Sequence, residues 1–453
     1  HLGSITQISD AELWHYLMRL IDHCLLEPLV TKEEQRFRIH NLTANFLSEE
    51  IEANAREEFN SQIRLNLAYW SEELLADRDN AFSILDQERL NIFRALDLSF
   101  SLPSSLFYPQ LKQIWQELAQ LLFRYIEQRG GAKYWLPIIA HVSQQLSEDI
   151  EVQCNLLNRV GSLYRIIHQL SNAIETHQLV LKKAREFEVT RTIVRAHLNL
   201  GTDYFEGRNY RMALKHGSLA LELFHNSISM QSEKASTLNL LGLALRENGD
   251  YEEAKAHFLK AVGLWDAEEL MPELARTLSN LATVHQLQGN YEKAIECFDQ
   301  AKERLKTNSS ILDETLLLLN EGSMHFALGN YEKAKNTFRL IQLDYLESVE
   351  HESYKAVTLN NLGQVALMQG NLSAARSLFD NSIVLWQQIG NELELANALS
   401  GLGDTFTKLG KLAFAIKAYE EVLALTLLFP DDAWANKLEA ETEKSLKSLM
   451  EKG

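Results

Sequence analysis

The sequence has few of the residues that break helices or cross-link small folds. Of 453 residues only six are proline, and none lies between Pro137 and Pro272. Because proline breaks helix interiors, this stretch, rich in Leu, Ala, Glu and Gln, predicts mostly helix. Cys24, Cys154 and Cys297 lie far apart without a CxxC pair. They predict neither a disulfide framework nor a zinc site, and they fit a reducing cytoplasm.

Long apolar runs and an excess of positive charge are also missing. No apolar run is long enough to cross a bilayer as a helix. The net charge of −18 argues against nucleic acid and against an anionic membrane surface as partners. The chain starts at His1-Leu2-Gly3-Ser4 without a methionine or a signal peptide. These residues are typical of a cloning remnant, which fits a fragment of a longer protein.

The motifs of common catalytic sites are missing as well. The 14 histidines form no HExxH pattern, and no Cys/His cluster has metal-ligand spacing. The sequence contains neither a GxSxG elbow nor a GxxxxGK[ST] phosphate loop. Adjacent carboxylates such as Glu252 and Glu253 are predicted to lie on outer helix faces in solvent. The sequence therefore predicts a protein that is not an enzyme and needs no cofactor.

What the chain does contain is a repeat, which is marked by three registers. An alanine recurs every 40 or 41 residues, with a small residue twelve positions before it and an aromatic four after most of them. The alanines are Ala173, Ala213, Ala254, Ala294, Ala334, Ala375 and Ala415. The small residues are Gly161, Gly201, Gly242, Ala282, Gly322, Gly363 and Gly403. The aromatics are Phe258, Phe298, Phe338, Phe379 and Tyr419, while His177 and Gly217 hold that position in the first two units.

Each register predicts a structural role. A Gly-Asn or Gly-Asp pair such as Gly289-Asn290 ends the first helix of a unit and turns the chain. We expect the small residues to let two helices approach closely and the aromatics to fill the gap between neighbouring units. A single helix pair cannot bury both of its faces, so the units must stack.

These registers resemble the tetratricopeptide repeat, in the 40-residue form of kinesin-light-chain-like and Gαi-adaptor-like proteins. The resemblance implies an all-α fold, a right-handed superhelix (an α-solenoid) whose first helices line a concave groove. It predicts seven helix pairs over residues 150–430. A capping helix is expected over 431–453, where Asp431 and Asp432 can cap it and Trp434 can cover the open end of the stack.

The N-terminal part has a different pattern. An amphipathic segment, a predicted hairpin with a strand over 36–40, and a second helix predict a winged-helix-like segment over 5–54. This part resembles the end of STAND ATPases of the NB-ARC type, as does the segment 84–96 inside an irregular helical linker with a degenerate first repeat, 55–149. In that family the histidine matching His40 contacts the phosphates of bound ADP. The other interpretation of His40 is a local hydrogen bond at a strand–helix junction.

A polar register follows the expected groove. Asparagines stand two positions before the small residue in several units, and arginines share their helix face. Amides can read the backbone of a bound segment, and arginines can bind its carboxylates. Alternatively, the asparagines cross-link neighbouring repeats. The candidate groove residues are Arg165, Arg195, Asn199, Arg246, Arg276, Asn280, Asn320 and Asn361.

Two classes of function follow from these patterns. The first is a cytoplasmic scaffold that binds protein or peptide segments and acts as the sensor of a STAND-type signalling ATPase, with an N-terminal ATPase domain in cis. The second is a stand-alone adaptor that assembles partner proteins without a nucleotide switch. A Walker loop encoded within about 300 residues upstream, roughly two domain lengths, would select the first.

Overall fold

The structure, a computed structural model, describes residues 26–30, 35–39, 74, 81–99, 109–145, 150–224, 230–306, 311–344, 352–430 and 432–451. The chain divides into two compact units, His1–Leu122 and Phe123–Gly453. The boundary falls inside a helix. The second unit holds the whole repeat array, and each unit is described by itself.

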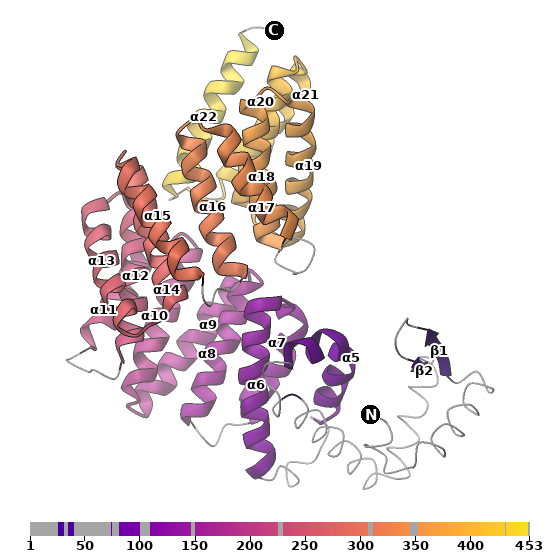
Figure 1. Ribbon diagram of the computed structural model, residues 1–453, viewed down its shortest axis with the longest axis vertical. Coiled ribbons are helices and arrows are strands. Elements are labelled where there is room, and N and C mark those ends of the chain that lie inside the picture. The colour runs from indigo at the N-terminus through magenta and orange to yellow at the C-terminus, as the bar shows by residue number, and fades with distance from the viewer. Residues whose placement is uncertain are drawn as a thin grey trace. The chain divides into compact units, whose positions relative to one another are not determined.

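The first unit contains an antiparallel hairpin, β1 (Leu26–Val30) and β2 (Gln35–Ile39), in which Leu26 lies opposite Ile39 (Figure 1). The predicted strand at 36–40 corresponds to β2. The helices expected on either side of the hairpin, and His40 with them, lie outside the described residues. The winged helix therefore stays a prediction.

Two further helices complete the described part of the N-terminal region. Helix α5 (Ala81–Ser99) carries the segment 84–96. Helix α6 (Pro109–Arg129) runs from the first unit into the second and ends at Gly130-Gly131. Both glycines have positive φ, 81° and 79°, which glycine adopts without steric cost. The buried residues of α6 include Leu118, Leu121, Leu122 and Tyr125.

The second unit continues with α7 (Ala132–Gln145) and then with seven antiparallel helix pairs, visible as consecutive hairpins in Figure 1. Within each pair the two helices pack on one another, and each pair packs on the next. This arrangement is an α-solenoid. The right-handed sense of the superhelix stays a prediction. The pairs are α8 (Ile150–Ile166) and α9 (Leu170–Glu186); α10 (Thr190–Glu206) and α11 (Tyr210–Glu222); α12 (Gln231–Glu247) and α13 (Tyr251–Ala267); α14 (Met271–Leu287) and α15 (Tyr291–Leu305); α16 (Ile311–Ala327) and α17 (Tyr331–Asp344); α18 (Glu352–Met368) and α19 (Leu372–Ile389); α20 (Glu392–Lys408) and α21 (Leu412–Thr426).

The turns inside the pairs adopt the left-handed cap that the sequence predicts. Gly249, Gly289, Gly329, Gly370 and Gly410 all have positive φ, between 71° and 86°. The first two pairs place His168 (φ 60°) and Arg208 (φ 57°) at this position. A non-glycine residue there carries local strain, because its Cβ crowds the following carbonyl.

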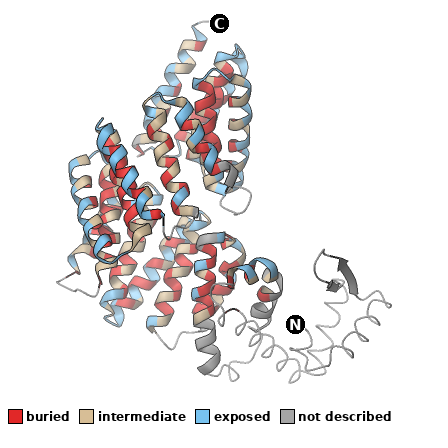
Figure 2. Cartoon of the chain, viewed as in Figure 1, coloured by how far each residue is buried: buried red, intermediate tan, exposed pale blue. Residues whose placement is uncertain are grey.

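In the third, fifth, sixth and seventh repeats a buried aromatic ring packs on the small residue of the same repeat. Figure 2 colours the buried residues of these helices red. Phe258 is fully buried, and a Cβ on Gly242 would lie 2.7 Å from its ring. The ring therefore packs inside its own repeat, in addition to the expected contact between units. Phe379 does both, since it lies against Gly363 of its own repeat and Gly401 of the next.

The first two pairs replace the aromatic differently. The imidazole of His177 lies directly against Gly161 and is fully buried. In the second pair Gly217 leaves the position empty, and Leu241 of the following repeat fills it, 2.7 Å from where a Cβ would stand. Both units thus keep a packed core without the aromatic ring.

Helix α22 (Ala433–Met450) follows the last pair. The Asp432 carboxylate accepts a hydrogen bond from the backbone N–H of Ala435 at 2.8 Å, which caps the helix. Leu438 and Leu449 are buried in the same cluster as Tyr419, so α22 covers the end of the stack. Among the described residues no helix is both long and apolar enough to span a membrane.

Candidate functional site

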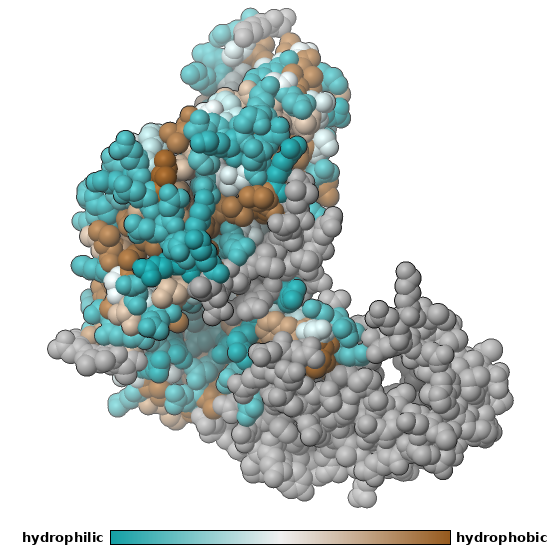
Figure 3. Space-filling view, in the orientation of Figure 1, coloured by the Kyte–Doolittle hydropathy of each residue, from teal (hydrophilic) through white to brown (hydrophobic). Residues whose placement is uncertain are grey.

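The second unit contains a groove of about 540 Å³, which lies in the size range of ligand-binding clefts. The first helices of the pairs line it, from α8 to α18, together with Trp265 of α13. In the view of Figure 3 the described surface is mostly hydrophilic, with apolar patches between. The groove mixes both characters: amides, hydroxyls and charged groups alternate with Leu198, Phe205 and Leu243.

The groove brings together five of the eight predicted residues. Arg165, Asn199, Arg276, Asn280 and Asn320 line the same cavity from α8, α10, α14 and α16. The remaining three, Arg195, Arg246 and Asn361, do not line it.

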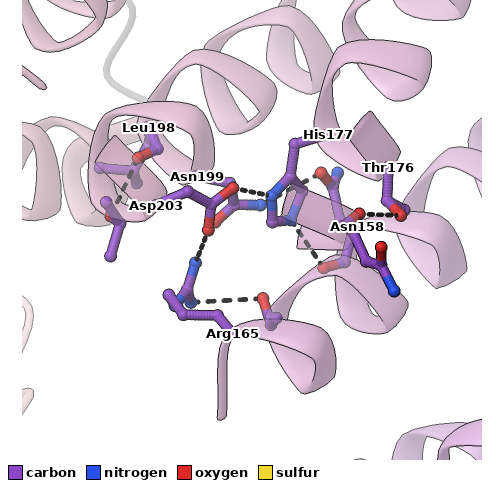
Figure 4. Close-up of polar contacts among 10 residues, drawn as sticks. Asn158, Arg165, Thr176, His177, Leu198, Asn199 and Asp203 are labelled. Carbon is purple, nitrogen blue, oxygen red and sulfur yellow. Dashed lines mark hydrogen bonds and ion pairs between the residues drawn. The ribbon is translucent and has the colours of Figure 1, made fainter. Parts of the chain in front are cut away.

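The asparagines of the groove connect adjacent first helices. The Nδ2 of Asn280 donates to the Oδ1 of Asn239 at 3.1 Å, which joins α14 to α12. Asn320 donates to the Ser279 hydroxyl at 2.8 Å. Asn199 donates to Asn158 in the same way, and Figure 4 shows this contact. The cross-linking interpretation therefore describes one hydrogen bond of each asparagine. Each amide still has a second N–H and a carbonyl oxygen for other partners.

These three hydrogen bonds form what we call the asparagine ladder. The sequence analysis did not identify the residues that accept them. Asn158, Asn239 and Ser279 stand three positions before the small residue of their repeats, one position before the predicted register. Their own 40-residue periodicity was a signal that could have found them. Each bond spans 41 residues along the chain, so donor and acceptor always belong to neighbouring repeats.

The four predicted arginines all have carboxylate partners inside the protein. Arg165 pairs with Asp203 at 2.8 Å, and Arg195 pairs with Glu233 at 2.8 Å. Arg276 lies 3.2 Å from Asp313 of the next repeat and 3.4 Å from Glu273. Arg246 pairs with its chain neighbour Glu247. A ligand carboxylate would therefore have to displace an internal partner before it could bind one of these guanidinium groups.

A buried network supports the groove from behind (Figure 4). The fully buried carboxylate of Asp203 contacts Arg165 with one oxygen and the Nδ1 of His177 with the other, at 2.5 Å. The Nε2 of His177 lies 3.1 Å from the carbonyl oxygen of Asn158. Burying a charge requires such partners, and together they fix the side chain of Arg165 at the groove wall.

Other reactive groups show no comparable arrangement. The structure places no cluster of three or more His, Cys, Asp or Glu residues suited to a metal ion within the part of the chain that it describes. Cys154 and Cys297 are free and buried, and burial raises the pKa of both thiols. A thiol with a raised pKa is a poor nucleophile, so these cysteines serve as small core residues.

Two segments of the chain, residues 233–307 and 354–427, match the family model of the tetratricopeptide repeat. These segments cover α12 to α15 and α18 to α21, so the chain contains tetratricopeptide repeats. Repeats of this kind form scaffolds suited to protein–protein interaction. Comparison with curated proteins gave no match.

Several solved structures are similar to this chain. The Cut9–Hcn1 hetero-tetramer of the APC/C matches with a TM-score of 0.49 and 15% identity, over 88% of this chain and 76% of that one. A Rap protein complexed with competence and sporulation factor gives 0.49 and 15%, over 84% and 97%. A tetratricopeptide repeat protein from Parabacteroides merdae gives 0.41 and 16%, over 64% and 98%.

Proposed function

We propose that the groove of the second unit binds an extended or helical segment of a partner protein. The observation that carries this proposal is that Arg165, Asn199, Arg276, Asn280 and Asn320 line one cavity, although they are far apart in sequence. A concave site with a few convergent polar groups on an apolar lining is typical of ligand binding.

The remaining hydrogen-bonding groups of the groove asparagines can recognise a partner segment. Each groove asparagine donates one N–H to a side chain of the preceding repeat. Its second N–H and its Oδ1 can form hydrogen bonds with the backbone of a partner segment. The neighbouring bond also fixes the amide plane, which lowers the entropy lost on binding. Backbone recognition of this kind tolerates different side chains in the partner.

The test is a pair of variants measured against peptides selected from a random library on the full chain. Replacing Asn280 and Asn320 together with alanine removes two backbone-binding amides, so we expect affinity to fall about tenfold or more. The helical circular dichroism signal should stay unchanged. The control is Lys293→Ala on the exposed face of α15. If the double asparagine variant bound with wild-type affinity while Lys293→Ala lost affinity, the groove would not be the binding site.

We further propose that the repeats act as the ligand sensor of a STAND-type signalling ATPase. The β1–β2 hairpin and helix α5, which carries the segment 84–96, support this assignment over a stand-alone adaptor. Because this sequence has no phosphate loop, we expect isothermal titration with ADP or ATP to give no heat of binding. Reading the gene upstream for a Walker loop separates the sensor from the adaptor.

A further inference from the structure

The charges of the groove do not balance. Each groove arginine is neutralised by a carboxylate of the protein itself, as described above. Beyond those pairs the lining keeps one further acid, Glu206, so two arginines stand against four carboxylates, three in the lining and Asp203 buried behind it. The charged groups of the lining are Arg165, Arg276, Glu206, Glu273 and Asp313.

Glu206 is the carboxylate of this set that has no ion pair. It lies at the C-terminal end of α10, lines the groove and is exposed. It makes no hydrogen bond or ion pair with any residue that the structure describes. Its two cationic neighbours are committed elsewhere: Arg165 pairs with Asp203, and Arg208 lies 3.5 Å from Asp432 and pairs with Glu394 as well.

The surroundings of Glu206 make a bound cation favourable. The groove walls raise the pKa of its carboxyl through desolvation, although the side chain stays open to the groove. Arg165 and Arg208 lower this pKa and Asp203 raises it, each by a smaller amount. A carboxylate in a concave, partly desolvated site attracts a cation more strongly than one on a flat surface.

We infer that the groove selects a partner segment with a lysine or arginine side chain, which binds at Glu206. This inference rests on the proposed function, because it names the charge of the segment that the groove binds. It reverses the expectation from sequence that groove arginines recognise acidic groups. The apolar side chains of Leu198, Phe205 and Leu243 would contact the rest of such a segment.

The test selects random peptides, displayed with equal basic and acidic content, on the full chain and on three variants. These are Glu206→Gln, which removes the charge, Glu206→Lys, which reverses it, and the control Glu253→Gln, an exposed acid on α13 outside the groove. We expect the wild type and the control to enrich basic peptides and Glu206→Lys to enrich acidic ones. A selected basic peptide should bind Glu206→Gln about tenfold more weakly.

A second arm changes the peptide in place of the protein. Replacing its lysine or arginine with glutamine should weaken binding to the wild type but not to Glu206→Gln. Enrichment of neutral or acidic peptides by the wild type, or unchanged affinity of Glu206→Gln, overturns the inference. If such peptides still lose affinity when Asn280 and Asn320 are replaced, the groove binds partner segments, but Glu206 does not select a basic side chain. If no peptide binds, or none depends on the groove, both are wrong.

Discussion

At the scale of single residues, the repeat depends on contacts between a ring and a glycine. The ring of Phe258 occupies the space in which the Cβ of any other residue at 242 would stand. Elsewhere in the same repeat, Gly263 lies in the exposed interior of α13 with no atom within 4 Å of such a Cβ. Two glycines on consecutive helices therefore have opposite roles.

Replacing each of them with alanine should have effects of opposite sign. Gly242→Ala forces the Phe258 ring to shift and should cost about 1–3 kcal/mol of unfolding free energy. Gly263→Ala should stabilise α13 by roughly 0.5–1 kcal/mol, since alanine loses less backbone entropy in a helix. Urea unfolding of both variants measures the difference. Equal midpoints would contradict the packing of the ring on the glycine.

A pair of histidines, one on α10 and one on α11, predicts a dependence of stability on pH. His197 is buried, and its Nδ1 lies 2.9 Å from the Nδ1 of His216. Burial lowers the pKa of His197 to about 4, and the charges of His216 and Arg185 add to this effect. Unfolded histidine takes up its proton near pH 6.5, so the folded state binds fewer protons between these values.

The stability due to a neutral His197 is therefore present above about pH 6.5 and is lost as the pH falls to about 4. We expect the loss from this side chain to reach about 3 kcal/mol. In His197→Gln, which does not titrate, the unfolding midpoint should fall less over the same range. Parallel pH profiles of the two proteins would show that His197 is protonated equally in both states.

The periodicity of residues made most of the repeat predictable from sequence, because each position meets the same neighbours in every unit. Glycines such as Gly249 and Gly289 mark the turn inside each helix pair, because few other residues adopt the left-handed conformation of that turn. Their recurrence therefore predicts both the turn type and the repeated fold. The partners of long polar side chains did not follow. Arg276 pairs with a carboxylate one repeat away, and Asn280 bonds to an amide one repeat away. Which of several reachable partners such a side chain contacts depends on the packing distances between the helices.

At the scale of elements, the first helices are joined by polar bonds as well as by packing. The Asn239–Asn280 bond links α12 to α14, and the Arg276–Asp313 pair links α14 to α16. A bond between half-buried side chains in adjacent elements couples the stabilities of those elements. These bonds thus couple the stabilities of neighbouring repeats along the groove wall.

A double-mutant cycle over Asn239→Ala and Asn280→Ala measures this coupling. Because the two side chains share one hydrogen bond, we expect an interaction energy of about 0.5–1.5 kcal/mol. The pair Asn239→Ala and Lys293→Ala, which share no contact, should give additive effects. Additivity in the first pair would mean that the amides do not bond one another in solution.

At the scale of the whole repeat array, a contact joins parts far apart in sequence. The Arg208 guanidinium, at the turn after α10, lies 3.5 Å from Asp432 and 5.3 Å from the centre of the Trp434 ring. It also pairs with Glu394 of α20 at 3.7 Å. One residue of the second repeat therefore contacts the last repeat and the capping helix.

Removing this contact should loosen α22. We expect Arg208→Ala to speed amide hydrogen exchange in α22 several-fold. The helix loses an ion pair and a cation–π contact, which together contribute about 1 kcal/mol. Lys437→Ala, whose pairing stays within α22, is the control. Unchanged exchange in α22 of the Arg208 variant would show that the contact contributes nothing to its stability.

The central claim, that partner segments bind the groove lined by the first helices, is tested most directly by photo-crosslinking. A peptide selected on the full chain carries a photo-reactive diazirine side chain, and mass spectrometry locates the crosslinked residues. We predict adducts on groove residues of α10, α12, α14 and α16, such as Asn280 and Leu316. Adducts confined to exposed residues of the second helices, such as Leu259 and Ile295, would contradict it.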